Sequence, residues 1–346
     1  MERRQSLIVI FGLFILAIVS ISVVLFSGHQ ATFNALQAYS ESSDISAMAQ
    51  YGSNSLVYSN GTNLALYDYT SGQISQLSPG FGVSGYSIDS VSVTSDNSFI
   101  IFHAQSAGVN NSLTEQFQTN GTTSPFGYWI VYNTTSRTFS ALPSSVVSAK
   151  ASGTNVAALQ TSTNGEQISV YNPSSLSVTK SIDVPGSVNF LVTDNGFLIQ
   201  NTSNNLLITK DGVVSEPVAS NASIIGSVSQ QQVLLSINQG SAKQLGLLNL
   251  QNDKIQHLAS SNVVGTPVIN NGVVLYTSSS SGSRVLYTYD LVTHKNLEWS
   301  FNGQLKNMNL SAMEAVTPIS DRAAIISLSN SSYYLVGQLA KPSGSL

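Results

Sequence analysis

One turn sequence recurs along this chain and constrains its fold more than any other feature. An apolar run ends in Asp or Asn, a polar turn follows, and an apolar residue returns six or seven positions later. The five copies are centred on Asp68, Asn133, Asn172, Asn249 and Asp290. An Asp or Asn side chain at a strand end accepts hydrogen bonds from the backbone N–H groups just ahead and starts a turn. The β-branched and aromatic residues on either side then pair as antiparallel strands, so each copy predicts a hairpin.

The spacing of these turns predicts a repeat of about 40 residues. The intervals between the Asp or Asn positions are 65, 39, 77 and 41 residues. The interval of 77 is nearly two units, with a degenerate hairpin at Leu206–Val214. The interval of 65 is one unit plus an insertion at Gln105–Phe126, which is rich in Ser, Asn, Gly and Thr and lacks strand alternation. Units of this length with short strands are typical of propeller blades.

Each unit also has an apolar strand ahead of its hairpin. Seven such strands are expected, at Ser55–Ser59, Ser98–His103, Asn155–Gln160, Gly196–Gln200, Gln232–Ile237, Gly272–Thr277 and Ala323–Leu328. Shorter inner strands precede them, for example at Ser90–Thr94, Val188–Thr193 and Val263–Ile269. The last unit, Met313–Leu339, lacks a fourth strand, which Ala31–Tyr39 could supply.

The fold class expected is therefore all-β: a β-propeller of about seven blades, with six to eight possible, preceded by one N-terminal transmembrane helix. A pair of β-sandwiches or a β-solenoid is the alternative, but regular hairpins at this spacing favour the propeller.

The order LVYS-NGTN-LALYDYTSGQISQLS, from Leu56 to Ser78, resembles a blade of the propellers in the Tol-system periplasmic protein and in prolyl oligopeptidase-type peptidases. The resemblance extends over most of residues 50–335 and implies the fold only. The chain has no room for the α/β-hydrolase domain of those peptidases. The tryptophan-aspartate and double-glycine turns of other propeller families are absent from these turns.

The first 26 residues predict a membrane anchor. Residues 1–6 are a short basic head, and Leu7–Phe26 is an uncharged apolar run of twenty residues, long enough to cross a bilayer as a helix. A cleaved signal peptide is the alternative, but Ser27–Ala31 is a poor cleavage site. Because Arg3 and Arg4 precede the run and the next basic residue is Arg137, the N-terminus is expected inside and residues 27–346 outside the cell membrane. The expected organisation is a stalk or linker at 27–44, a propeller ectodomain at 45–340 and a disordered tail at 341–346.

Composition indicates an extracellular environment. Charged residues make up only 9% of the chain, and residues 27–346 have a net charge of −5, which is not a nucleic-acid footprint. Eight glycosylation sequons are candidates, at Asn60, Asn110, Asn120, Asn133, Asn201, Asn221, Asn309 and Asn330. Few charges, many sequons and no cysteine together suggest an archaeal surface protein. An acidic outside medium is a further hypothesis, since a fold with few carboxylate ion pairs loses little stability when carboxylates protonate.

The sequence assigns no catalytic, cofactor-binding or metal-binding residue. The four histidines show no nucleophile-elbow or metal-binding spacing, and no phosphate-binding or dinucleotide motif occurs. Asp89 with Asp96, and Glu314 with Asp321, flank inner strands and could bind a cation, although such residues more often cap turns. Recurrent tyrosines are interpreted as core filling rather than as a carbohydrate-stacking surface.

The insertion Gln105–Phe126 is the best candidate for binding, because long loops on rigid scaffolds tend to carry function. Phe117, Phe126 and Tyr128 are candidate partner anchors; a glycosylated, disordered loop is the alternative. The leading hypothesis is a binding or scaffold subunit of a surface complex, or an adhesin, whose partner is an envelope protein or a glycan. The alternatives are a membrane-tethered enzyme acting on extracellular glycans or small molecules, and a solute-binding partner of a transporter. Each would place its site in the propeller channel or in a closed pocket.

Overall fold

The structure is a computed structural model. It describes residues 31–39, 47–52, 55–59, 63–68, 73–77, 86–106, 127–184, 186–194, 196–210, 213–215, 217–240, 242–258, 263–270, 273–280, 283–294, 296–302, 313–320, 323–328 and 333–338. Within these residues every regular element is a β-strand, so the expected all-β class is confirmed. No helix among them is long and apolar enough to span a bilayer, and the predicted anchor Leu7–Phe26 lies outside the described residues.

Five sheets each contain four strands that follow one another in the chain and pair as neighbours. The first sheet has β2 (Ala47–Tyr51), β3 (Ser55–Ser59), β4 (Leu64–Asp68) and β5 (Gln73–Gln76). The second has β6 (Tyr86–Val93), β7 (Phe99–Ser106), β8 (Tyr128–Asn133) and β9 (Thr138–Ala141). The third has β10 (Val146–Ser152), β11 (Asn155–Ser162), β12 (Gly165–Tyr171) and β13 (Val178–Asp183).

The fourth sheet has β14 (Ser187–Thr193), β15 (Gly196–Asn201), β16 (Leu206–Lys210) and β17 (Val213–Val214). The fifth has β18 (Ala222–Ser229), β19 (Gln232–Gln239), β20 (Ala242–Asn249) and β21 (Lys254–His257). All seven strands expected ahead of the hairpins are present. Each is the second strand of its array, that is, of a set of four strands that pair as neighbours. The degenerate hairpin is the β16–β17 pair.

The sixth sheet contains eight strands and joins the two ends of the described chain. It has β22 (Val263–Asn270), β23 (Val273–Ser280), β24 (Ser283–Asp290), β25 (Asn296–Asn302), β26 (Met313–Ser320), β27 (Ala323–Leu328), β28 (Tyr333–Gln338) and β1 (Ala31–Tyr39). Strand β1 pairs antiparallel with β28 and parallel with β25. It thus supplies the strand that the last unit lacks. The number of hydrogen-bonded sheets is six rather than the seven most favoured by the sequence, because β1 connects two four-strand arrays into one sheet.

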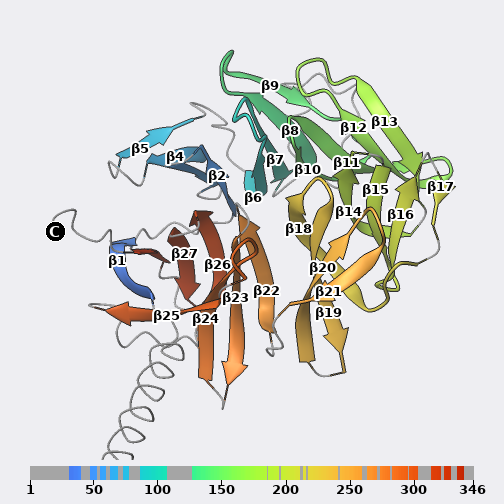
Figure 1. Ribbon diagram of the computed structural model, residues 1–346. Coiled ribbons are helices and arrows are strands. Elements are labelled where there is room, and N and C mark those ends of the chain that lie inside the picture. Colours follow the sequence, from blue (N-terminus) through green and yellow to red (C-terminus); the bar gives the residue numbers. More distant parts are fainter. Residues whose placement is uncertain are drawn as a thin grey trace, which may run out of the picture.

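The sheets are arranged around a ring, as in a β-propeller (Figure 1). The first strands of successive sheets contact one another along β2, β6 and β10, and again along β14, β18, β22 and β26. The contact between β26 and β2 closes the ring. Because neighbouring strands within an array are antiparallel, their connections alternate between two faces of the ring.

We name these faces by their connections. The turn face carries the connections between the first and second, and between the third and fourth, strands of each array. The loop face carries the connections between the second and third strands and those between successive arrays. The five predicted Asp or Asn turns follow third strands and therefore share the turn face.

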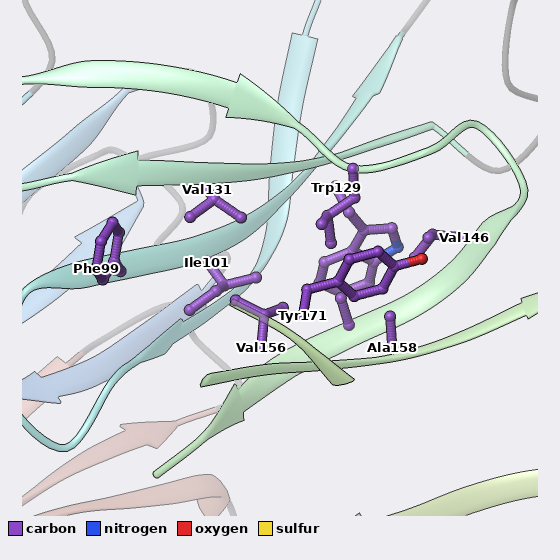
Figure 2. Close-up of a cluster of buried hydrophobic side chains, with 10 residues drawn as sticks. Phe99, Ile101, Trp129, Val131, Val146, Val156, Ala158 and Tyr171 are labelled. Carbon is purple, nitrogen blue, oxygen red and sulfur yellow. The ribbon is translucent and has the colours of Figure 1, made fainter. Parts of the chain in front are cut away.

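Apolar side chains that alternate along the strands pack between neighbouring sheets. One cluster joins the second sheet to the third, and Figure 2 shows its side chains directed toward one another; it includes Ile101, Trp129, Val131, Val156 and Tyr171. Buried tyrosines recur in these layers, as core filling predicts: Tyr58, Tyr67, Tyr132, Tyr171, Tyr276 and Tyr289. This packing between sheets stabilises the ring without disulfides, since the chain has no cysteine.

The predicted turn chemistry is confirmed in four described copies. The Oδ1 atoms of Asn133, Asn172, Asn249 and Asp290 accept hydrogen bonds of 2.8–3.2 Å from backbone N–H groups two or three residues ahead. Four positions after each of them the backbone has positive φ, at Arg137, Leu176, Asp253 and His294. The turn therefore contains a left-handed position that the sequence pattern does not reveal, because none of these four residues is glycine.

Candidate functional site

A polar and aromatic cluster lies near the loop-face end of the second sheet. Asp89 is the extra residue of a bulge in β6, between Ile88 and Ser90. The bulge brings its carboxylate to His103 in β7, where Oδ1 lies 2.6 Å from Nδ1. The Asp89 side chain is 47% exposed, whereas that of His103 is 12% exposed. The pair therefore presents a carboxylate to solvent and holds the imidazole ring in a defined orientation.

Trp129 fixes the other side of the imidazole. Residues His103 and Trp129 are direct partners in the β7–β8 register, and their rings stack with centroids 4.7 Å apart. The indole Nε1–H donates a 3.1 Å hydrogen bond to the carbonyl of Val147 in β10 of the next sheet. The aromatic ring is thus pinned across the boundary between two sheets, so the cluster is part of the rigid scaffold.

Gly127 approaches this cluster closely, just before β8. Its φ is +80°, and a Cβ at this position would lie 2.5 Å from His103 Nε2 and 2.9 Å from the Ala104 carbonyl oxygen. Only glycine fits this backbone conformation and this space. The backbone at Gly127 therefore lies against the Nε2 edge of the imidazole, directly after the connection that the sequence singles out for binding.

A second polar feature crosses the boundaries between inner strands. The Lys150 ammonium in β10 donates hydrogen bonds to Asn189 Oδ1 at 3.2 Å and to the Phe190 carbonyl oxygen, both in β14, and lies over the Phe190 ring. Asn189 Nδ2 reaches the Ile224 carbonyl oxygen of β18 at 3.5 Å. Desolvation lowers the pKa of Lys150 to about 8. These contacts link three sheets through the Lys150 amine and the Asn189 side-chain amide.

The structure tests one of the two carboxylate pairs that the sequence grouped, and separates it. Asp89 lies within β6 and Asp96 in the turn that follows this strand, so they do not share a cation site. Asp96 instead accepts a 3.2 Å hydrogen bond from the Ser98 N–H, which makes it a turn cap. Asp321 lies outside the described residues, whereas Glu314 is in β26. No group of three or more His, Cys, Asp or Glu side chains arranged to hold a metal occurs among the residues that the structure describes.

The candidate partner anchors have different outcomes. Tyr128 is 7% exposed and packs in the cluster that includes Phe102, Ile130 and Tyr132, so it contributes to the core rather than to an exposed surface. Phe117 and Phe126 lie outside the described residues.

Three sequon asparagines are described. Asn133 and Asn201 are half-buried and accept backbone hydrogen bonds, and Asn221 is exposed with φ +55°. The other five, Asn60, Asn110, Asn120, Asn309 and Asn330, lie outside the described residues.

The His103 cluster was missed by sequence reasoning. Asp89 flanks the expected strand Ser90–Thr94 and His103 ends the next expected strand, Ser98–His103, which is a weak signal for contact. In the register that pairs Val93 with Ile100, Asp89 would lie opposite Ala104, and only the bulge moves it to His103. A bulge of this kind has no sequence signature here.

Comparison with solved structures supports the propeller fold. The β-propeller domain of the Trilobed protease from Pyrococcus furiosus superposes with a TM-score of 0.58 at 10% identity, over 89% of this chain and 98% of that one. Pyrococcus horikoshii acylaminoacyl peptidase superposes with a TM-score of 0.56 at 11% identity. The match covers 89% of this chain but only 53% of the peptidase chain. A chain of the mitotic checkpoint complex gives 0.54 at 10% identity, over 88% and 90%.

At such low identity these likenesses show the fold alone, and they bear out the resemblance to prolyl oligopeptidase-type propellers at that level. No family model matches the sequence, and no curated protein matches it significantly.

Proposed function

We propose that this protein is a membrane-anchored, extracytoplasmic β-propeller that acts as a binding or scaffold subunit of a cell-surface complex and carries N-linked glycans. The apolar run Leu7–Phe26 and the distribution of basic residues support the anchor and its orientation. The partner class is an envelope protein or a glycan. Propellers serve both scaffolds and peptidases, so the fold is compatible with this function without deciding it.

The observation that carries the binding function is the His103 cluster and its position. Residues 107–126, between β7 and β8, separate consecutive strands of one sheet by far more chain than the other such connections do. The strands on either side hold His103 and Trp129 rigidly, and the Asp89 carboxylate is exposed beside them. A long connection on a rigid platform with an exposed charged group is typical of binding sites.

The test is a crosslinking pull-down of the tagged full-length chain from native membranes, with bound species identified by mass spectrometry. In one variant a Gly-Ser dipeptide replaces residues 108–125; in a control, Thr163→Ala and Asn164→Ala alter another exposed connection on the loop face. A stoichiometric partner that is lost only in the first variant supports the function. Retention of the partner in that variant, or recovery of a solitary wild-type protein, contradicts it, provided that circular dichroism shows folded chains.

As part of this proposal, the ring has seven blades. The eight-stranded sheet divides naturally into β22–β25 and an array of β26, β27, β28 and β1, which meet through the four-residue parallel pairing of β25 with β1. The contacts of β22 with β26 and of β26 with β2 are those expected if each array begins with its own inner strand.

An enzyme is the second candidate, and the His103–Asp89 pair favours it, because an imidazole oriented by a carboxylate is suited to general acid–base chemistry. This candidate requires turnover of an extracellular glycan or small molecule by the purified chain. It also requires that Asp89→Asn lower that turnover at least tenfold without unfolding the protein.

A further inference from the structure

Strand β1 ties the N-terminal segment to one face of the ring. Its first residue, Ala31, pairs with Trp299 at the middle of β25, and Phe33 pairs with Gln338, the last residue of β28. Strand β25 begins just after the turn that follows Asp290, and β28 runs antiparallel to β1. Both pairings therefore direct β1 from the turn face toward the loop face, and the pairing with β28 places its beginning at the turn face and its end, Tyr39, at the loop face.

Only four residues, 27–30, separate the predicted anchor from β1. Four residues of extended chain reach about 14 Å. The two faces of the ring are farther apart, since the eight-residue strands β19 and β20 rise about 23 Å between their ends at about 3.3 Å per residue. While β1 stays paired on both sides, the chain is too short to bring the loop face to the bilayer.

We propose that the turn face lies against the lipid surface and that the loop face points away from the membrane. This proposal rests on the anchor of the proposed function and adds the orientation of the ring. It places the turns that contain Arg137, Leu176, Asp253 and His294 toward the lipid headgroups. It places the His103 cluster on the outward face, where a partner in the envelope can reach it.

Seven of the eight sequons fall at loop-face strand ends or connections, as this orientation requires, and Asn133 is the exception. Asn201 ends β15 and Asn221 precedes β18, so both are at the loop face, whereas Asn133 ends β8 at the turn face. The five sequons outside the described residues fall between β3 and β4, β7 and β8, β25 and β26, or β27 and β28, and the strands flanking each of these connections end at the loop face. Candidate glycans thus gather on the face that points away from the bilayer.

The absence of cysteine allows a direct test with single-cysteine variants. Gln251→Cys is in an exposed position on the turn face, and Gln239→Cys is its matched control on the loop face of the same sheet. Val292→Cys adds a turn-face position that is 83% exposed and adjoins β25, the partner of β1. Each full-length variant is labelled with an environment-sensitive fluorophore and reconstituted in phosphatidylcholine vesicles that contain headgroup spin-labelled lipid.

The expected result is quenching at positions 251 and 292 that is at least threefold stronger than at position 239. Equal quenching at 251 and 239, or stronger quenching at 239, overturns the orientation even though the chain is inserted. Release of the wild-type chain from native membranes by alkaline carbonate contradicts the anchor itself, and so separates failure of the proposed function from failure of the orientation. Unchanged melting temperatures in detergent control for the fold of each variant.

Discussion

The turns of the repeat place side chains in a backbone conformation that favours glycine. Arg137, Leu176, Asp253 and His294 have φ between 53° and 58°. For a residue with a Cβ this conformation costs roughly 1–2 kcal/mol. The Asp or Asn side chain four residues earlier keeps the turn closed despite this cost, because its oxygen accepts hydrogen bonds from the N–H groups within the turn.

Replacement of Arg137 by glycine should therefore stabilise the protein. Arg137 is exposed, and relief of the backbone strain exceeds the greater flexibility of glycine in the unfolded chain, so we expect a gain of about 0.5–1 kcal/mol in the free energy of unfolding. Urea unfolding of the ectodomain measures it. Thr135→Gly, two positions earlier in the same turn and not at positive φ, is the control and should destabilise by about 0.5–1 kcal/mol. Equal effects of the two changes would contradict the strain argument.

Lys150 should make the free energy of unfolding depend on pH in the alkaline range. Burial lowers its pKa to about 8 from the ordinary value of 10.5, so the unfolded chain binds more protons between these values. Stability should then rise with pH across this window, by about 2 kcal/mol between pH 7 and pH 9.5. Lys150→Met should abolish the rise, which urea unfolding at the two pH values detects. A rise of the same size in the variant would assign it to another group.

At the scale of elements, β1 differs from the other strands because it pairs with two strands that lie far from it in the sequence, β25 and β28. Its pairing with β25 is the only parallel one among the described strands, and β1 joins the first residues described to the last. Its residues 31–34 pair with β25 and its residues 33–39 pair with β28, with an irregularity between Ala35 and Gln37. The ring is therefore closed by a segment that lies far from both partners in the sequence.

Removal of β1 should open the ring. A chain that begins at residue 40 exposes the edges of β25 and β28, so we expect a lower melting temperature and a less cooperative transition than for a chain that begins at residue 28. Differential scanning calorimetry of the two ectodomains measures both quantities. Addition of a peptide with the sequence of residues 31–39 should restore part of the loss. Identical melting curves for the two chains would show that β1 does not close the ring.

At the scale of the whole molecule, apolar packing between sheets holds the described part of the ring together. His103–Asp89 is the one ion pair found among the described residues. Hydrogen bonds lower the pKa of Asp96, and the bond from the Thr94 side chain has the largest effect. Hydrogen bonds also lower the pKa of Asp290, and the bond from the Thr293 backbone N–H has the largest effect. A carboxylate with a lowered pKa adds stability above its unfolded pKa and loses it as the pH falls through its folded pKa.

Acid should therefore weaken this protein only at low pH. For Asp96 and Asp290 the loss begins near pH 4 and continues below it, because their unfolded pKa values are about 3.9. Urea unfolding at pH 7, 5 and 3 should show that the wild type keeps most of its free energy of unfolding at pH 3. Asp290→Asn preserves the oxygen acceptor, so this variant should lose less free energy of unfolding between pH 7 and pH 3 than the wild type. A collapse between pH 5 and pH 3 would refute the acid-tolerance hypothesis.

Local physics accounts for what the sequence by itself determined. The Asp or Asn turns, the strands before them and the propeller class were predicted correctly, because each depends on hydrogen bonds within a few residues or on alternation along one strand. The twofold period of a strand and the repeat of about 40 residues are both visible without a three-dimensional model.

Only the tertiary structure decided the features that join distant segments. The pairing of β1 with β25, the bulge that carries Asp89 to His103, the contact of Lys150 with Asn189 and the burial of Tyr128 all depend on register or on packing between sheets. A one-residue bulge redirects a side chain with no change in composition, and the edge that a closing strand selects is set by the whole ring. These long-range choices define the candidate site and the face proposed to meet the membrane.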